Sequence, residues 1–194
     1  MSATGRPAAS VRKPADRRVS RTRRRIDEAF LALLRTRGYD GVAVSDIVRD
    51  ADVGRATFYE HYASKDELLR AQLRHVVTLL RPRPGQPDWL DATPLFAHVR
   101  DVPLLYRLIA GRSAAARTLR IMQEVLHERV AELLAAHAAA GAALRTPLTD
   151  AIAARVIVAD LAALLAWWTE GGMAEPPEAM QAMFLACVGP LAAG

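Results

Sequence analysis

The sequence has one cysteine, few aromatic residues and no long uncharged apolar run. Because Cys187 is the only cysteine in 194 residues, an intrachain disulfide and a metal cage built from cysteines are both excluded. Aromatic residues make up 6% of the chain and β-branched runs are scarce, whereas Ala, Leu and Arg are abundant. This composition favours helices, so we expect an all-α protein. The single cysteine suits a reducing compartment.

No segment qualifies clearly as a membrane-spanning helix or a secretory signal. The most apolar stretch, residues 151–168, is interrupted by Arg155 and Asp160, whereas a membrane span needs about 18 or more uncharged residues. We interpret it as a buried or interface helix. The charged N-terminus is not followed by the apolar segment of a signal peptide. Both observations predict a cytoplasmic protein with no membrane partner.

Motifs typical of enzymes are also missing. The chain has no glycine-rich phosphate loop, no HExxH and no GxSxG. Its five histidines do not recur at the spacings of metal ligands. We therefore expect no cofactor, no metal and no catalysis.

Positive charge is concentrated at one end of the chain. Residues 1–25 contain nine Arg or Lys and one Asp, a net +8, while the whole chain carries +5. A basic terminus on a mildly acidic body indicates a polyanionic partner at that end: nucleic acid, or alternatively an anionic membrane surface. Residues 1–19 lack periodicity and are expected to form a disordered arm, either inert or in contact with DNA.

The next segment has the pattern of several short helices with strong end signals. Ser20 is a candidate N-cap for a first helix ending at Gly38, and Ser45 for a second. Asp52 tolerates the left-handed conformation of a tight turn, and Gly54 can cap the helix that follows. Two short helices joined by such a turn form a helix-turn-helix, a DNA-reading unit.

A long helix is expected to join this unit to the remainder of the chain. Ser64 and Glu67 form a capping box ahead of an amphipathic run ending near Leu80. Three prolines and a glycine in residues 81–87 then break it. Further helices are expected at 93–99, 103–110, 113–140, 149–170 and 176–188. We therefore divide the chain into an arm (1–19), a DNA-binding domain (20–64), a connecting helix (65–80) and a C-terminal ligand-binding and dimerisation domain (81–194).

These features resemble the DNA-binding domain of TetR-family transcriptional regulators over residues 22–70. The resemblance is carried by Phe30, Gly38-Tyr39, Ser45-Asp46-Ile47, Ala51-Asp52-Val53, Thr57-Phe58-Tyr59, His61-Tyr62 and Lys65-Asp66-Glu67-Leu68-Leu69. The family commonly has Gly where Asp52 stands and Ser or Thr where Gly54 stands. The run from Trp167 to Gly172 also looks like one variety of the family's C-terminal domain. The resemblance implies a homodimer built on the last two long helices, with an effector pocket inside each body.

The candidate DNA contacts divide into positioning and reading groups. Arg55, Ala56, Thr57 and Glu60 are best placed for base edges, since Arg55 can pair with guanine and Thr57 can contact a thymine methyl. Glu60 is otherwise a solvated residue. The expected phosphate contacts are Ser45 and Lys65 at helix N-termini, Tyr59 and His61 by resemblance, and Arg23 and Arg24. The alternatives are a half-core Tyr59 and a His61 that only balances the helix dipole.

The C-terminal half offers bulky side chains for a pocket and an interface. The candidate pocket residues are His98, Tyr106, Met122, Trp167 and Met183, and the candidate dimer residues are Leu161, Leu164, Trp168, Met180 and Phe184. Neighbouring Trp167 and Trp168 point about 100° apart on a helix, so one is expected in the core and the other at the partner subunit. The prediction is a homodimeric repressor released from a palindromic DNA site by a small-molecule effector. The alternative is a ligand-independent regulator or architectural DNA-binding protein with a filled body.

Overall fold

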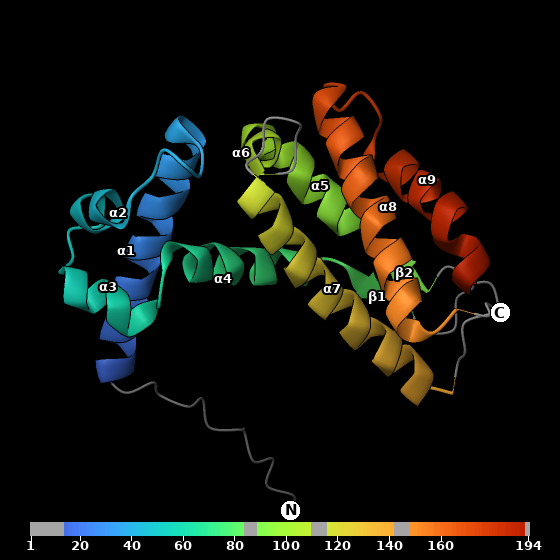
Figure 1. The fold of residues 1–194 in the computed structure, drawn as a ribbon, viewed down its shortest axis with the longest axis horizontal. Coiled ribbons are helices and arrows are strands. Elements are labelled where there is room, and N and C mark those ends of the chain that lie inside the picture. Colours follow the sequence, from blue (N-terminus) through green and yellow to red (C-terminus); the bar gives the residue numbers. More distant parts are fainter. Residues whose placement is uncertain (1–13, 84–88, 110–115, 142–147, 193–194) are drawn as a thin grey trace, which may run out of the picture.

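The computed structural model describes residues 14–83, 89–109, 116–141 and 148–192, and most of these residues lie in helices. Two groups of helices are joined by one connecting helix (Figure 1). The first group, the head, contains α1 (Pro14–Arg37), α2 (Val44–Asp50) and α3 (Arg55–His61), and the connection is α4 (Lys65–Val77). The second group, the body, contains α5 (Thr93–Asp101), α6 (Pro103–Ile109), α7 (Ala116–Ala139), α8 (Asp150–Glu170) and α9 (Pro177–Ala192). The predicted all-α class is confirmed.

The first helix begins earlier than its sequence signals predicted. It starts at Pro14, a residue that suits the first turn because its missing N–H has no helical partner there. Ser20 therefore lies inside α1, and its prediction as N-cap is wrong. The expected arm of residues 1–19 overlaps the start of this helix, and residues 1–13 lie outside the described part of the chain.

The head is held together by a small apolar core. One face of α1 contributes Ile26, Phe30 and Leu34, which are buried at spacings of three and four residues. Ile47 of α2 and Phe58 of α3 are fully buried against them. Gly38 ends α1 in the left-handed conformation (φ 67°), as its sequence signal predicted.

The second helix is capped by a different residue from the one predicted. It begins at Val44 with Ala43 as its N-cap, so Ser45 is already inside the first turn. The Asp46 carboxylate accepts the Ala43 N–H at 3.1 Å and also lies 3.5 Å from Arg37 and 3.2 Å from Arg49. Asp46 thus performs the capping that was assigned to Ser45.

The contribution of Asp46 should depend on pH. The hydrogen bond from Ala43, helped by Arg37 and Arg49, lowers the pKa of Asp46 below its ordinary value. A carboxyl group with a lowered pKa stabilises the fold while ionised, and that stability disappears as the pH falls through the folded-state pKa. We expect Asp46→Ala to lower the Tm of the head at pH 7 and to have no effect near pH 2, as measured by thermal melts. Asp50→Ala, which removes only a surface pair with Arg49, is the control. An equal loss of Tm at both pH values would contradict this role.

The connecting helix has its predicted start but ends sooner. Ser64 Oγ accepts the Glu67 N–H at 3.1 Å, which confirms this half of the capping box. Helix α4 ends at Val77 instead of Leu80. The chain then forms β1 (Arg81–Pro82), which pairs antiparallel with β2 (Leu90–Asp91) and was not foreseen from the proline-rich sequence. This short strand pair is stabilised by a residue distant in sequence. The buried side-chain amide of Gln181 in α9 accepts the Ala92 N–H and donates to the Leu90 carbonyl.

The body is a bundle in which α8 packs against α7 and α9. Helix α8 is long and apolar enough, by length and composition alone, to cross a membrane. It nevertheless buries Ala153, Ile157, Leu161, Leu165 and Trp168 inside the protomer, as the core helix of a globular domain does. Helix α9 continues through Gly189-Pro190 to Ala192, so its predicted end at Val188 is wrong.

Two sets of contacts fix the head relative to the body. Helix α4 is held on α7 by ion pairs along its length: Asp66 with Arg117 (3.0 Å), Arg70 with Glu124, and Arg74 with Glu128 (3.2 Å). In addition, α1 of the head packs against α6 of the body. The connecting helix is therefore the covalent link but not the sole mechanical link between the two parts.

Candidate nucleic-acid interface

The turn between α2 and α3 is fixed by a residue from α1. Asp52 adopts the left-handed conformation (φ 48°) that the sequence predicted for it. Arg25 donates to the Asp52 carbonyl at 2.9 Å and to its carboxylate at 2.8 Å. Asp52 stands where TetR-family domains commonly have glycine, and here it has Arg25 of α1 as a partner. This pair was not foreseen, because its members are far apart in sequence.

Gly54 caps α3 without contributing a side chain. Its backbone is extended (φ −69°, ψ 149°), and this is the N-cap position that the sequence predicted. A Cβ at Gly54 meets only Thr57 Oγ1, at 3.7 Å. A serine or threonine therefore fits here, so the backbone does not require glycine, and α3 lacks one side-chain cap that a hydroxyl would supply.

Helix α3 has one buried and one exposed face. Phe58 is completely buried beneath it, whereas Arg55, Ala56 and Glu60 are exposed and Thr57 is half-buried. The four residues expected to reach base edges thus include three on the open face and one at its margin. Helix α3 itself lies on the side of the head away from the body (Figure 1), which leaves its exposed side chains accessible to a DNA groove.

Tyr59 lies on the open face beside Arg55. Its ring is 46% exposed, and the Arg55 guanidinium carbon lies 5.8 Å from the ring centroid. Phe58 supports it from below through an edge-to-face contact at 5.4 Å. The half-core alternative for Tyr59 is therefore partly realised, since its ring packs on one side and its hydroxyl remains free for a phosphate. His61 is half-buried at the end of the helix.

The expected phosphate contacts of α1 and α2 are available to different degrees. Ser45 is exposed in the first turn of α2. Arg24 is exposed, with only a loose pair to Glu28 at 3.6 Å. Arg23 instead donates to the Tyr62 hydroxyl at 2.9 Å, and that hydroxyl donates to Asp27 at 2.6 Å. Burial and this bond to Asp27 raise the pKa of Tyr62 to about 12, so the hydroxyl stays neutral. Arg23 is therefore partly committed to holding α3 on α1.

Lys65 is used mainly inside the head. Its ammonium donates to the carbonyls of Tyr39 and Val42 at 2.8 and 2.7 Å and lies 4.1 Å from the Tyr39 ring centroid. Burial lowers the pKa of Lys65. Two of its three donors thus hold the loop before α2, and the third remains for the phosphate contact expected from the sequence.

Further basic residues flank the reading helix. Arg18, Arg21 and Arg24 are exposed near the start of α1. The start of α1 and helix α3 lie at the same end of the head (Figure 1). A positive surface therefore borders the open face of α3, as a phosphate-contacting flank requires.

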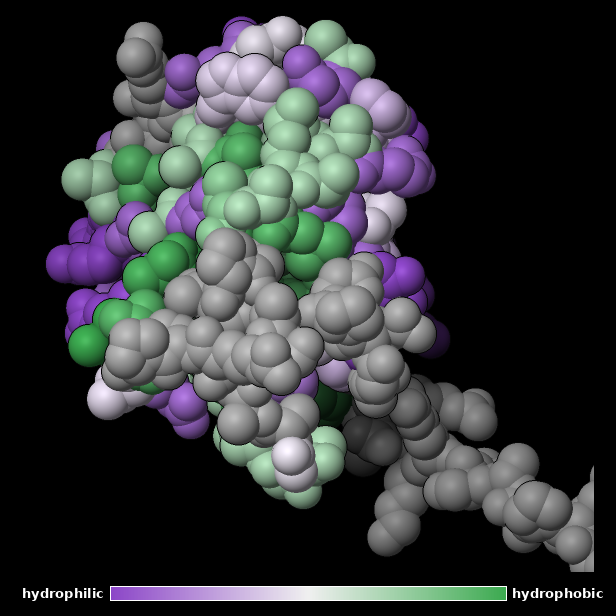
Figure 2. Space-filling view, turned by 90° about the vertical axis from the view of Figure 1, so that its right-hand side faces the viewer, coloured by the Kyte–Doolittle hydropathy of each residue, from purple (hydrophilic) through white to green (hydrophobic). Residues whose placement is uncertain are grey.

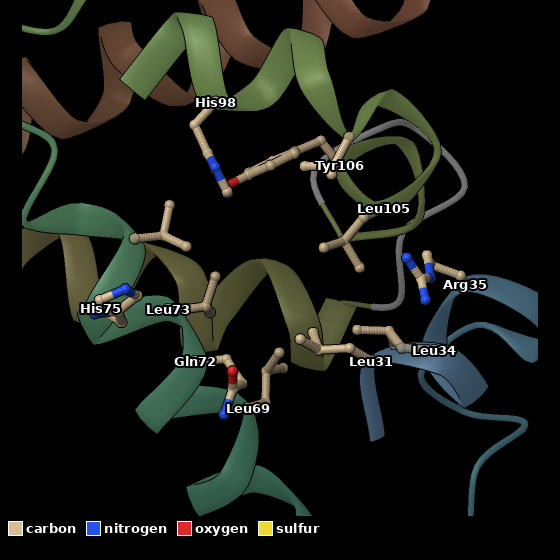
Figure 3. A pocket seen from close by; sticks show the side chains of 12 residues that line it. Leu31, Leu34, Arg35, Leu69, Gln72, Leu73, His75, His98, Leu105 and Tyr106 are labelled. Carbon is tan, nitrogen blue, oxygen red and sulfur yellow. The ribbon is translucent and has the colours of Figure 1, made fainter. Parts of the chain in front are cut away.

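The structure separates the candidate pocket residues into three groups. His98 and Tyr106 line a cavity of about 210 Å³ between α1, α4, α5 and α6 (Figure 3). Met122 is buried in α7 but does not border this cavity. Trp167 and Met183 are exposed on α8 and α9, at 51% and 37%, so they face away from the interior of the protomer.

The candidate interface residues lie mostly inside their own protomer. Leu161, Trp168, Met180 and Phe184 are fully buried, and Leu164 is half-buried. Trp168 packs edge-to-face on Phe96 at 5.7 Å, and its ring N–H donates to the Glu175 carbonyl at 3.1 Å. The sequence expectation of one inward and one outward tryptophan fits the structure, but Trp168 is the inward one.

An exposed apolar stripe on α8 was not identified from the sequence. It consists of Ile152, Val156, Ala159, Ala163 and Trp167, spaced three or four residues apart and all exposed. Met183 lies on the neighbouring helix α9. Apolar side chains gather across this side of the molecule (Figure 2). The spacing was available in the sequence, but it did not distinguish this face of α8 from the buried one, which is equally apolar.

Metal-binding clusters are not a feature of the described residues. Across the ranges given above, no group of three or more His, Cys, Asp or Glu side chains is arranged to hold an ion.

Comparison with known proteins also identifies a DNA-binding domain in the N-terminal part of the chain. Residues 26–71 match the family model described as bacterial regulatory proteins, tetR family. This match places the DNA-binding domain of the chain in the TetR family. An uncharacterised helix-turn-helix regulator of Bacillus subtilis (strain 168), YxbF, is 48% identical over 63 residues, which span 32% of this chain and only 17% of that relative.

The similarity extends to the body at the level of fold. TylP, a TetR regulator from Streptomyces fradiae, superposes with a TM-score of 0.64 at 23% identity, covering 90% of this chain and 88% of that one. FadR from Bacillus subtilis, whose structure contains stearoyl-CoA, gives 0.58 at 14% identity, covering 85% and 96%. At these identities the comparison establishes a shared fold and not a shared ligand.

Proposed function

We propose that this protein is a cytoplasmic, sequence-specific transcriptional regulator that binds a palindromic DNA site as a homodimer. The observation that carries the proposal is the open face of α3, where Arg55, Ala56 and Glu60 are exposed over a buried Phe58. A recognition helix anchored from below and bordered by basic residues is the arrangement with which helix-turn-helix proteins enter the major groove.

The homodimer is supported by the exposed stripe on α8. Monomeric proteins rarely leave such a continuous apolar face on a long helix. Two copies related by a two-fold axis can each cover the other's stripe, because the same surface then serves both subunits. The two reading helices of a dimer would then dock in successive major grooves about 34 Å apart.

A repressor released by a small molecule is the form of regulation that we propose. The cavity of about 210 Å³ next to the head supports it, and FadR shows that this fold can hold a small molecule. The alternative, a ligand-independent or architectural DNA-binding protein, does not need such a cavity. Release requires that the ligand bind more tightly to a conformation in which the two heads are wrongly spaced for DNA. A shift in the ratio of that conformation to the DNA-binding one from 1:99 to 99:1 needs about 5.5 kcal/mol of differential affinity.

Selection of bound sites from random DNA tests the DNA-reading function. The purified protein should enrich a palindrome with two half-sites. Arg55→Ala should relax the preference at one base pair of each half-site, because a bidentate contact to guanine is worth about 1–3 kcal/mol. Arg107→Ala, which changes an exposed arginine of α6 on the body, should leave the selected site unchanged. Failure to enrich any site would refute sequence-specific binding, and an unchanged preference in the Arg55 variant would remove that residue from the reading set.

A further inference from the structure

We propose that the cavity between head and body is itself the effector site, and that it takes a small single-ring compound with one carbonyl group. This inference rests on the proposed function and places the effector at the junction between domains, in contact with the DNA-binding head. The resemblance implied a pocket inside the body instead.

The walls of this cavity come from three separate parts of the molecule. Leu31 and Leu34 belong to α1 of the head, Leu69 and Leu73 to the connecting α4, and Leu105 and Tyr106 to α6 of the body (Figure 3). A molecule bound there touches all three parts at once. Its contacts therefore change when the head turns relative to the body. Such a difference in contacts is the condition for a ligand to shift the equilibrium between the two head orientations.

The size and lining of the cavity determine the class of compound. Seven of the twelve lining residues are leucine or valine, and Arg35, Gln72 and His75 line it as well as His98 and Tyr106. A volume of about 210 Å³ is below the range of drug-sized sites, whereas an apolar cavity of about 150 Å³ is known to hold benzene. One six-membered ring with a short substituent therefore fits, and a long acyl chain does not.

Tyr106 supplies the polar group that selects within this class. Its side chain is only 3% exposed overall, and its hydroxyl lies at the cavity beside His98 (Figure 3). Burial raises the pKa of Tyr106, which keeps the hydroxyl protonated as a donor. A ligand that fills the cavity displaces water from this hydroxyl, so a ligand that brings an acceptor oxygen restores the hydrogen bond and one without an acceptor leaves the donor unpaired.

His98 completes the polar end of the cavity. Its ring meets Tyr106 edge-on with centroids 5.9 Å apart, and the polar tips of the two side chains point toward one another (Figure 3). Burial lowers the pKa of His98, with an opposing effect from Asp101 and a reinforcing one from His75. The imidazole is therefore neutral at pH 7, and an uncharged carbonyl suits this end better than an ion.

Acetophenone and ethylbenzene are matched probes for this site, because they share a ring and a two-carbon substituent and differ in the carbonyl oxygen. With the full-length protein, we expect acetophenone to bind more tightly than ethylbenzene, by NMR titration. Tyr106→Phe keeps the ring and removes the donor, so it should weaken acetophenone about fivefold and leave ethylbenzene unchanged, as the loss of one hydrogen bond predicts. Equal effects on both probes, or no binding of either, would overturn the proposed ligand class.

Filling the cavity by mutation tests the coupling to DNA without any ligand. Leu105 points into the cavity (Figure 3), whereas its neighbour Leu104 is 53% exposed. We expect Leu105→Trp to exclude both probes and to weaken binding to the selected DNA site by about tenfold, within the usual range of allosteric coupling. Leu104→Trp should do neither. Val76→Phe enlarges a lining side chain on α4 and serves as a second filled variant if Leu105→Trp does not fold.

The outcomes separate this inference from the proposed function. If the filled variants bind the selected site as tightly as Leu104→Trp does, the junction is not the effector site, although the protein remains a DNA-binding regulator. If the wild-type protein selects no site, the regulator proposal fails, while probe binding still reports on the cavity.

Discussion

Trp167→Glu should yield a folded monomer that no longer binds a two-half-site operator tightly. Trp167 is 51% exposed at the end of the α8 stripe, so its replacement leaves the core of the protomer intact. In a two-fold interface each substitution counts twice, and loss of an aromatic anchor costs about 2 kcal/mol or more per copy. The dimer should therefore weaken by roughly a thousandfold at about 1.4 kcal/mol per factor of ten.

The loss of DNA binding follows from the loss of the second head. In a dimer, docking of one head places the other close to its half-site, which raises the overall affinity by about 10²–10⁴. Sedimentation equilibrium measures the oligomeric state and a fluorescence titration measures operator affinity. Leu104→Glu, which introduces the same charge at an exposed leucine on α6, is the control and should remain dimeric. A Trp167→Glu protein that is still dimeric would show that the subunits meet on another surface.

Phe58→Ala should unfold the head, although the neighbouring Tyr59→Ala should not. Phe58 is fully buried in the core of the head, and removal of a buried phenylalanine side chain costs about 3–5 kcal/mol. A head of three helices has little stability beyond that amount. Tyr59 is 46% exposed, so its truncation should change stability by only about 0.5 kcal/mol.

Hydrogen exchange distinguishes these two variants, because it reports on the head separately from the body. In Phe58→Ala, amides of α1 to α3 should lose protection while those of α7 and α8 keep it, and operator binding should vanish. In Tyr59→Ala, protection should be unchanged and operator affinity should fall through loss of the proposed phosphate contact and of the ring beside Arg55. Retained protection in Phe58→Ala would show that the head does not depend on this side chain.

Local signals in the sequence determined most of the helical architecture. The left-handed positions at Gly38 and Asp52, the caps at Gly54 and Ser64, and the glycine after α8 act over a few residues, so the sequence alone predicts them. The same applies to the recognition face, because burial of Phe58 follows from helical spacing. These signals were sufficient for the family resemblance and for the exposed face of α3 on which the proposed DNA contacts lie.

The misjudged caps show where local signals compete. Ser20 and Ser45 are both good N-cap residues, but α1 starts earlier at a proline and α2 is capped through Asp46. Each segment contains several acceptable starts, and their free energies differ by only about 1 kcal/mol. Packing against the rest of the head is enough to decide among them.

Tertiary structure alone decided how side chains distant in sequence are used. It paired Arg25 with Asp52, directed Lys65 into the loop before α2 and chose Trp168 over Trp167 for the core. It also created the junction cavity, whose walls come from α1, α4, α5 and α6. Local sequence determines which residues are apolar and which segments form helices, but a cavity or an interface depends on how several helices pack, and that arrangement is determined by the summed contacts of the whole chain.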